Sequence, residues 1–400
     1  MTETITVQSW THSLPPFPTS LNLVSTLLPL ESPPLGPNDL LIEIYSAGLN
    51  PVDVQLSNLS IFKLPSLGSI PRGLGKDFSG KLLAKGSNVG GEFQIGDEIF
   101  GVTMNPLGGP LSGTLSTISI LDFSRSLIIK KPPLLSHSQA ASLPLSFLTG
   151  KTCLSKPYFS LPTPQLSSSS SSTTTRGRGG MIVILGGSTS VGIQIIQYSK
   201  LKFPSLKIIS TGSTRNLKFL KSLGVDEVID YTREESVLNH LKQFREEEGE
   251  GGFISIIDCV GGLNELLSTG EWKHLISTTG SYVSIVGDKT DKNRLGGFFT
   301  NFWNWKQCLR SLQKYNPYQW FGFGRGGGGG PKYYCIDFDM TKKEWLEELK
   351  EIFQDEEDGK KERGMKIFIE QEFEFDKVGK AFEKLVQGKS VGKIVVNIKK

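Results

Sequence analysis

The sequence predicts an α/β protein in which a doubly wound parallel sheet is combined with a β-rich domain. Two observations support this fold class. Strand and helix patterns alternate between residues 181 and 286, which is typical of right-handed βαβ units. Short apolar runs punctuated by glycine precede this region, and strand-like runs return after residue 360. Since 400 residues exceed one ordinary core, we expect about two domains.

The first part of the chain reads as a set of short strands. Apolar runs rich in β-branched and aromatic residues, bounded by glycine or proline, predict strands at residues 40–49, 80–84 and 95–102. Small and apolar residues then suit a helix over residues 138–154, interrupted near Pro144.

The middle and the end of the chain follow regular patterns. In the middle, strands are expected at residues 181–185, 207–211, 225–229, 253–257 and 280–286, with helices at 191–201 and 216–223. Towards the end, we expect a helix at 342–353, a strand at 365–370, a helix at 376–387 and a strand at 393–398.

Two segments break these patterns. Residues 157–180 are rich in Ser and Thr and cannot bury apolar surface, so we expect a disordered insertion, a solvated loop rather than a phosphorylated regulatory tract. Residues 290–331 form an aromatic and Gly-rich insertion. Three interpretations of it stay open: packing against the body of the protein, a lid over an apolar substrate, and a patch for a membrane or a partner.

Composition restricts the partners and the compartment. The net charge of +4 forms no continuous basic stripe, which argues against nucleic acid as a partner. The cysteines are scattered without a metal or disulfide pattern. No apolar run approaches a membrane span of about 18 residues, and the first basic residue is Lys63, unlike a signal peptide or presequence. We expect a cytoplasmic protein, with mitochondrial or lipid-droplet association as the alternative.

A phosphate-binding turn is the strongest local signal. The letters LGGSTSVG at 185–192 follow a buried strand and open a helix, so backbone N–H groups can face a pyrophosphate. The residues expected to bind it are Gly187, Ser188, Thr189, Ser190, Val191 and Gly192. Because Thr189 replaces the middle glycine of GxGxxG, the motif alone is weak.

The loop after the second strand of this region indicates which nicotinamide cofactor binds. About 20 residues past the turn, where an NAD site places an acidic residue on the ribose, this chain has Ser213, Thr214 and Arg215. Hydroxyl groups and a guanidinium suit a 2′-phosphate, and no carboxylate repels it. We therefore expect NADPH as the cofactor; a capping loop with a solvated arginine is the alternative.

A series of motifs in order resembles one family. They are AGLNPVD at 47–53, LGKDFSG at 74–80, GDEIFG at 96–101, AASLPLSFLTG at 140–150, GGSTSVG at 186–192, SLGVDEVIDYT at 222–232, DCVGG at 258–262 and GKIVV at 392–396. The chain thus resembles the medium-chain dehydrogenase/reductase superfamily, and within it the zinc-independent quinone oxidoreductases. It looks like their fungal branch, related to the reticulon-interacting mitochondrial type.

The resemblance implies a domain order and roles for single residues. A Rossmann NADPH-binding domain, residues 136–360, would be inserted in a GroES-like β-rich catalytic domain formed by residues 1–135 and 361–400. Asn50 would line the nicotinamide and substrate pocket. The remaining cofactor contacts would come from Thr149 and from Tyr231, Val260, Val286 and Gly287. For Tyr231 and Val286, ordinary core packing is the alternative. Members of the superfamily are commonly dimers, so a homodimer is also expected.

A metal site is not expected. Zinc needs three or four Cys, His or carboxylate ligands, and zinc-dependent relatives supply a Cys after the AG turn and a GHE motif. Here the first place holds Asn50 and Asp53, the second holds Lys76 and Asp77, and the four histidines lie elsewhere.

These residues predict a zinc-free oxidoreductase that passes a hydride from NADPH to a quinone or an α,β-unsaturated carbonyl compound, by stacking cofactor and acceptor together. Enoyl reductases of the superfamily place a tyrosine acid where this chain has Phe62, so the proton would come from solvent or from Tyr45. The alternative is a catalytically weak NADPH-binding sensor or interaction protein at a membrane or lipid-droplet surface.

Overall fold

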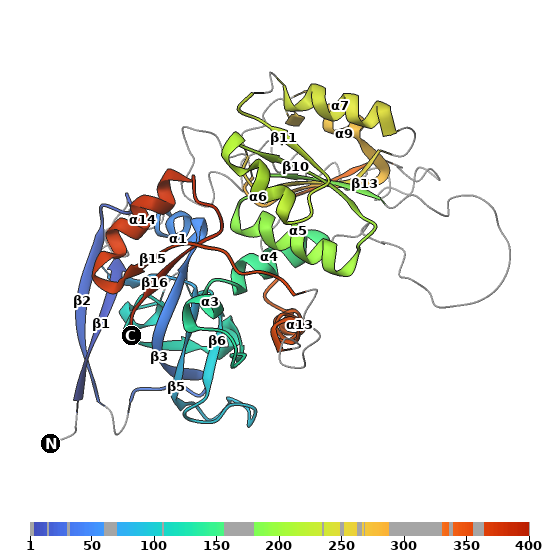
Figure 1. The fold of residues 1–400 in the computed structure, drawn as a ribbon. Helices are drawn as coiled ribbons and strands as arrows, with labels where there is room; N and C mark the ends of the chain where they lie inside the picture. Colours follow the sequence, from blue (N-terminus) through green and yellow to red (C-terminus); the bar gives the residue numbers. More distant parts are fainter. Residues whose placement is uncertain are drawn as a thin grey trace, which may run out of the picture. The chain divides into compact units, whose positions relative to one another are not determined.

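The computed structural model describes residues 4–13, 16–29, 33–59, 70–105, 108–155, 180–233, 236–248, 252–261, 266–267, 269–287, 330–335, 339–354 and 364–399 (Figure 1). The predictions for the Ser/Thr tract, for most of the aromatic and Gly-rich segment and for Phe62 lie outside these residues. The chain divides into two compact units. Unit 1 contains the described residues of Met1–Leu148 and Phe338–Lys400, and unit 2 those of Thr149–Lys292 and Asn301–Asp337.

Unit 1 is the β-rich part. Its described elements are β1 (Thr4–His12), β2 (Leu21–Pro29), β3 (Asp39–Leu49), α1 (Pro51–Ser57), β4 (Arg72–Gly73), β5 (Asp77–Lys85), β6 (Glu98–Thr103), β7 (Ile118–Asp122), β8 (Ser126–Lys130), α3 (His137–Ala141), α13 (Lys343–Gln354), β15 (Ile369–Glu374), α14 (Val378–Gln387) and β16 (Lys393–Asn397). Short 3₁₀ turns lie at Pro110–Ser112, Phe123–Arg125 and Phe375–Lys377. The helix α4 (Pro144–Leu154) begins in unit 1 and continues into unit 2.

Segments from both parts of the sequence build one sheet in unit 1. Its strand order is β15-β16-β3-β5-β6-β8, with β7 also paired to β3. The strand β16 lies between β15, to which it is parallel, and β3, to which it is antiparallel, with Ile394 opposite Leu49. Figure 1 shows the red C-terminal strands beside the blue β3. A smaller sheet has the order β2-β1-β4. Of the two parts of the predicted fold, the β-rich GroES-like domain is thus confirmed.

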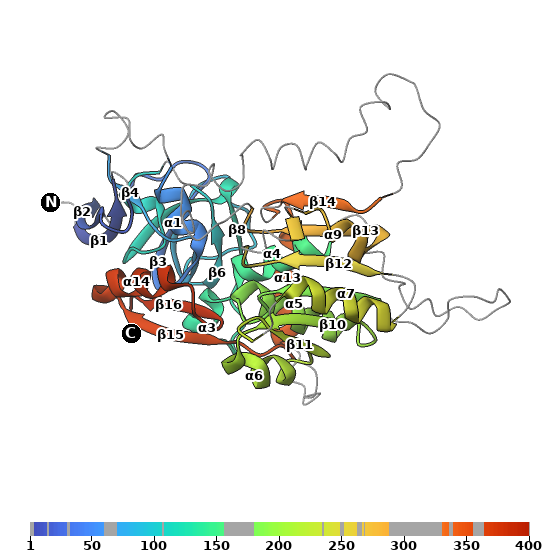
Figure 2. The same ribbon diagram turned by 90° about the horizontal axis from the view of Figure 1, so that it is seen from above.

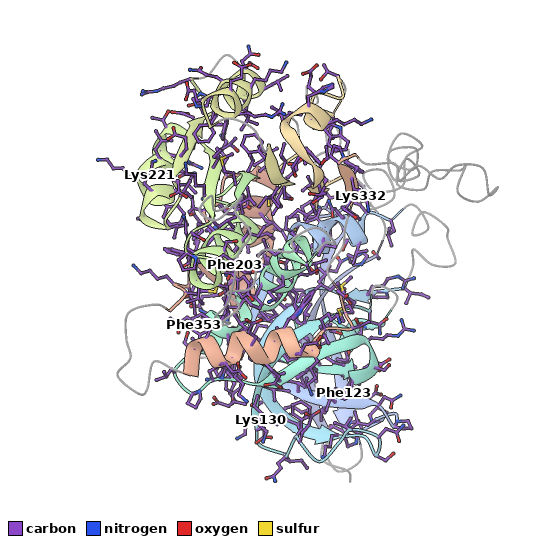
Figure 3. All side chains as sticks on the ribbon, turned by 90° about the vertical axis from the view of Figure 1, so that its right-hand side faces the viewer. Phe123, Lys130, Phe203, Lys221, Lys332 and Phe353 are labelled. Carbon is purple, nitrogen blue, oxygen red and sulfur yellow. The ribbon has the colours of Figure 1, made fainter. Side chains whose placement is uncertain are left out.

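Helices close the apolar face of unit 1. Phe382 of α14 is fully buried and meets Phe17 edge-on, with ring centroids 4.7 Å apart. The helix α13 contacts β8, and its Lys343 pairs with Glu92 at 2.8 Å. Figure 3 shows Phe123 and Lys130 beside this helix.

Unit 2 is a parallel sheet covered on both faces. Its described elements are β9 (Met181–Leu185), α5 (Ser190–Lys202), β10 (Lys207–Gly212), α6 (Leu217–Ser222), β11 (Glu227–Asp230), α7 (Val237–Glu248), β12 (Phe253–Asp258), α9 (Trp272–Leu275), β13 (Ile276–Ser284) and β14 (Lys332–Cys335). The strand order β11-β10-β9-β12-β13-β14 is that of a dinucleotide-binding sheet. In Figures 1 and 2, α5 and α6 lie on one face and α7 and α9 on the other. The doubly wound sheet is therefore confirmed.

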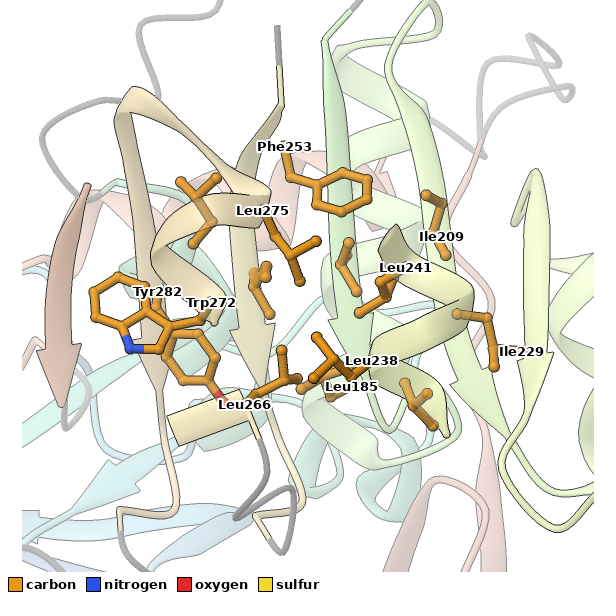
Figure 4. Close-up of a cluster of buried hydrophobic side chains, with 14 of the residues drawn as sticks. Leu185, Ile209, Ile229, Leu238, Leu241, Phe253, Leu266, Trp272, Leu275 and Tyr282 are labelled. Atoms are coloured by element: carbon orange, nitrogen blue, oxygen red, sulfur yellow. The ribbon is translucent and has the colours of Figure 1, made fainter. Parts of the chain in front are cut away.

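The core of unit 2 lies between this sheet and α7 with α9. Leu238 and Leu241 of α7 face Leu185 and Ile209 of the sheet (Figure 4). In the same core, the rings of Trp272, Tyr282 and Tyr333 pack together. Burial of these side chains stabilises the sheet and so fixes the positions of its strand ends. The loops of the site follow these strand ends.

Four predicted strands begin three or four residues away from the observed start: β5 and β13 begin earlier, at Asp77 and Ile276, and β6 and β15 begin later. The two that begin later have a physical reason. The strand β6 begins at Glu98, not at residue 95, because Gly96 has a φ of +97° and Asp97 accepts a hydrogen bond from the Gln94 N–H, which makes a turn. The strand β15 begins at Ile369, four residues later than predicted. It is an edge strand with mostly exposed side chains, so its position leaves little apolar signal.

Candidate functional site

The turn between β9 and α5 has the geometry of a phosphate cradle. Gly186 has a φ of +86°, and a Cβ at Gly192 would lie 2.5 Å from the Gly186 carbonyl oxygen. A Cβ at Gly187 would lie 2.1 Å from the hydroxyl of Ser210. The backbone can therefore make this turn only with glycine at these places. It leads into the N-terminus of a helix of 13 residues, where N–H groups and the helix dipole favour an anion.

Thr189, at the middle glycine position of the motif, caps the helix that follows. Its hydroxyl accepts a hydrogen bond from the Gly192 N–H at 3.0 Å and donates to the Gly186 carbonyl at 2.8 Å. The departure from GxGxxG thus strengthens the turn rather than disrupting it. Ser188 is held as well, since its hydroxyl accepts from the Asn216 side chain at 3.0 Å. That contact ties the turn to the loop after β10.

The loop after β10 carries Ser213, which is half-buried, and Thr214 and Arg215, which are exposed. The Thr214 hydroxyl donates to the carboxylate of Asp230 at 2.6 Å, and Thr232 donates to the other oxygen of that carboxylate at 2.6 Å. These hydrogen bonds, that of Thr214 first, lower the pKa of Asp230. Asp230 therefore fixes the loop, which the sequence did not indicate because the two segments meet only through sheet pairing.

The other predicted cofactor residues of unit 2 follow its strand ends. Tyr231 comes directly after β11 and is 55% exposed. Val260 follows β12, and a Cβ at Gly186 would lie 2.3 Å from its side chain. Val286 and Gly287 follow β13, where the Gly287 N–H donates to the Ser284 hydroxyl at 3.0 Å. Because parallel strands end at one edge, these residues and the turn gather at the same edge of the sheet.

Thr149 differs from the other predicted cofactor residues because it lies in the middle of a helix, not at a strand end or at the turn before α5. It belongs to α4 and is buried. At its neighbour Gly150, a Cβ would lie 3.2 Å from Ile195 of α5, so the two helices pack closely there.

The predicted catalytic residue, Asn50, lies in a buried polar cluster of unit 1. It is the N-cap of α1, and its backbone N–H donates to Asp53 at 2.7 Å. Its side-chain amide donates to Asp77 at 3.0 Å and to the Gly48 carbonyl at 3.3 Å, and it accepts from Lys393. The participation of Lys393 was not predicted, since no local pattern links a lysine to an asparagine 343 positions away.

Buried charges surround this asparagine. Burial raises the pKa of Asp53 to about 6, and the nearby Lys76 ammonium opposes that rise. Burial likewise lowers the pKa of Lys76, against the attraction of Asp53. Lys393 and Asp77 form an ion pair at 2.7 Å with both side chains at most 3% exposed. The positions at which zinc-dependent relatives would carry ligands thus hold one amide, two carboxylates and one ammonium group.

Metal-type side chains do not gather elsewhere in the described part of the chain, where no group of three or more His, Cys, Asp and Glu residues is found. A chain of Ser79, His137 and Glu98 does occur, with Ser79 Oγ 2.8 Å from His137 Nδ1 and His137 Nε2 3.5 Å from Glu98. Ser79 is completely buried, whereas Glu98 is half exposed. A nucleophilic serine has to be accessible to its substrate, and the carboxylate that orients its histidine is buried. Ser79, His137 and Glu98 therefore have a structural role.

Tyr45, an alternative proton donor, lies in the same neighbourhood as His137, with ring centroids 4.4 Å apart. Burial, followed by the charge of Glu43, raises its pKa.

Across the helices that the structure describes, none is long and apolar enough to cross a bilayer.

Comparisons with known proteins agree with this architecture. Residues 36–118 match the profile of the alcohol dehydrogenase GroES-like domain, and residues 223–396 match that of the zinc-binding dehydrogenases. The mouse protein NAD(P)H oxidoreductase RTN4IP1, mitochondrial, is 30% identical over 378 residues, which cover 90% of this chain and 82% of the mouse protein.

Two further likenesses concern a plant enzyme and a bacterial structure. The 2-methylene-furan-3-one reductase of Solanum lycopersicum is 35% identical over 214 residues, 52% of this chain and 50% of the tomato protein. The match thus spans half the length of that relative. The structure of the quinone oxidoreductase from Coxiella burnetii superposes with a TM-score of 0.68 over 99% of this chain and 100% of that one, at 24% identity.

Proposed function

From the premise that the chain belongs to the medium-chain dehydrogenase/reductase superfamily, in its zinc-independent type, we propose that it transfers a hydride from NADPH to a quinone or an α,β-unsaturated carbonyl compound. The superfamily consists of oxidoreductases that use a nicotinamide cofactor, and the finer statement is ours. The observation that carries it is the glycine turn before α5, followed by a hydroxyl- and arginine-bearing loop at the next strand end.

The choice of NADPH rests on the charges of that loop. Arg215 is exposed, and a guanidinium can bind the 2′-phosphate through two hydrogen bonds. The carboxylate of Asp230 is the nearby group that would repel a phosphate. However, it accepts hydrogen bonds from Thr214 and Thr232, and Arg233 lies 3.7 Å from it.

The class of acceptor follows from the chemistry that the residues support. A conjugated acceptor accepts a hydride at carbon while its electron pair moves to oxygen, and a proton completes the reduction. NADPH and one proton thus yield NADP⁺ and a hydroquinone or a saturated ketone. Positioning of the two rings provides most of the rate enhancement. The name of the tomato relative denotes a ketone conjugated to a methylene group, which supports the enone arm of the proposal.

In this proposal Asn50 lines the nicotinamide and substrate pocket. Its amide is orientated by protein groups, so its geometry is preorganised before a substrate binds. The cofactor contacts are those of Gly187–Gly192, Ser213–Arg215, Thr149, Tyr231, Val260, Val286 and Gly287.

The test is turnover by the purified full-length chain. It is incubated with NADPH and a panel of quinones and enones, and the loss of absorbance of the reduced nicotinamide is followed. We expect turnover with at least one acceptor and weaker activity with NADH. Tight NADPH binding without turnover on any acceptor contradicts the proposal and favours the alternative, an NADPH-binding sensor or interaction protein. The burial of Asn50, at 2% exposure, is the observation that keeps this alternative in view.

Location and assembly remain predictions of the sequence. We propose a cytoplasmic homodimer, with peripheral membrane contact, mitochondrial location or lipid-droplet association as the alternatives. Fractionation of the native cell and the mass of the purified protein in solution test them.

A further inference from the structure

We propose that Lys393 is a positioning residue for the reaction, which fixes the side-chain amide of Asn50 through a buried network that includes Asp77. This inference rests on the proposed function and deepens it. Three stretches of unit 1 that are distant in sequence meet here: the end of β3, the start of β5 and the start of β16.

The hydrogen bonds of the network form a closed triangle. The Lys393 ammonium donates to Asn50 Oδ1 and, over 2.7 Å, to Asp77 Oδ2. Asn50 Nδ2 donates to the same carboxylate oxygen at 3.0 Å. The other oxygen, Asp77 Oδ1, accepts from the Leu145 N–H at 2.9 Å, which anchors the carboxylate to the start of α4. Each side chain of the triangle therefore contacts the other two.

This arrangement allows one orientation of the Asn50 amide. An ammonium group only donates and a carboxylate only accepts, so the amide oxygen must face Lys393 and the amide nitrogen must face Asp77. Rotation of the amide by 180° would place two donors together and two acceptors together. Without the ammonium, Asn50 Oδ1 loses the donor that enforces this choice, and Asp77 loses its buried counter-charge.

The backbone is built around the lysine side chain. A Cβ at Gly48 would lie 2.9 Å from Lys393 Cε and 2.3 Å from the Ala141 carbonyl oxygen, so glycine makes room for the lysine stem. At 3% exposure, Lys393 has lost its hydration, which a surface ion pair would retain. A buried lysine so closely accommodated indicates a role beyond solubility.

The kinetic test compares two lysines of the C-terminal segment. Lys393→Met keeps the length of the side chain and removes the charge, while Lys377→Met removes an exposed ammonium that pairs with Asp376. We expect Lys393→Met to lower kcat about tenfold or more with the NADPH Kd changed less than about threefold, and Lys377→Met to leave both unchanged. In an Asn50→Ala background, Lys393→Met should cause less than about a twofold further loss, because it acts through Asn50.

A spectroscopic test separates this inference from the proposed function. With ¹⁵N-labelled asparagine, the side-chain amide resonance of Asn50 is identified by its absence in Asn50→Ala. We expect it to shift and to exchange faster with water in Lys393→Met, but not in Lys377→Met. If Lys393→Met does not fold, Lys393→Arg, which keeps the charge but changes the donor geometry, should shift the resonance without losing the fold.

An unmoved Asn50 resonance, or losses of kcat that simply multiply in the double variant, would overturn the role of Lys393. A wild-type protein that turns over no acceptor overturns the proposed function instead. That failure is recognised because the resonance still responds to Lys393→Met.

Discussion

Two buried titratable residues of unit 1, His12 and Asp53, make the stability of the fold depend on pH in opposite directions. Burial, together with the positive charges of Lys76 and Arg72, lowers the pKa of His12 from 6.5 to about 4. A lowered pKa means that the unfolded chain binds the proton more tightly, so the contribution of His12 is present above pH 6.5 and is lost as the pH falls towards 4. Asp53, whose pKa is raised from 3.8 to about 6, acts in the opposite direction. Its contribution to the free energy of unfolding is present below pH 3.8 and is lost as the pH rises through about 6.

We therefore predict that His12→Gln flattens the acid limb of the stability curve. Wild type should lose roughly 3 kcal/mol through this group between pH 6.5 and about pH 4, and the variant should not. Urea unfolding at half-unit pH steps measures both curves, and Asp53 contributes equally to each. Parallel curves would show that His12 is not buried as a neutral ring.

At the same scale, Arg215→Ala tests the choice of cofactor. Loss of charge-assisted hydrogen bonds to the 2′-phosphate should weaken NADPH binding by roughly tenfold or more, with NADH affected less than about twofold. Titration of the bound nicotinamide fluorescence gives both constants. Lys218→Ala, an exposed lysine two residues inside the following helix turn, is the control. Equal losses for NADPH and NADH would assign Arg215 another role.

At the scale of elements, two glycines in helices test whether the turn before α5 is a cradle. Gly192→Ala drives a methyl group against the Gly186 carbonyl and should weaken NADPH binding about tenfold while destabilising the protein by about 1–3 kcal/mol. Gly379→Ala in α14 meets only Leu21, at 3.8 Å, and should stabilise by about 0.5–1 kcal/mol. Calorimetry and NADPH titration of both variants check this. Unchanged affinity in Gly192→Ala would refute the cradle.

Helices and strands could be predicted where burial requires a regular pattern of apolar residues in the sequence. The strands β9, β10 and β12 lie inside the parallel sheet and are mostly buried. The strand β9 is a continuous apolar run, whereas β10 and β12 combine isoleucines with buried polar residues, and the predicted bounds of all three agree with the structure to within one residue. By contrast, β2 is a partly exposed edge strand that includes Leu27, 71% exposed, and it was not predicted. Its residues are ordered by pairing with β1, which no local pattern reveals.

The same distinction applies to the site. The glycine turn follows from local sterics, so sequence could locate it. The Asn50, Asp77 and Lys393 contacts depend on pairing between β16 and β3, and Asp230 on pairing between β10 and β11. Such contacts follow from topology, and only the folded sheet brings them together.

At the scale of the whole molecule, unit 1 depends on contacts between distant segments. Phe382→Ala removes a fully buried ring from Phe17, 365 positions earlier, and should cost about 3–5 kcal/mol. Leu134→Ala, at a 47% exposed leucine, should cost less than about 0.5 kcal/mol. Chemical unfolding followed by tryptophan fluorescence measures both. A loss below about 1 kcal/mol in Phe382→Ala would mean that the two segments are not coupled.

The position of β16 between β15 and β3 also sets an order of events on the ribosome. Until Lys393–Asn397 has left the exit tunnel, β3 lacks its neighbour β16, and its backbone groups on that edge have no partner strand. Unpaired strand edges attract other chains, so unit 1 is prone to aggregation between the emergence of β3 and the emergence of β16. The described strands of unit 2 all precede residue 336, so they do not depend on this late segment. Chaperone dependence should therefore concentrate in the interval in which β3 has emerged and β16 has not.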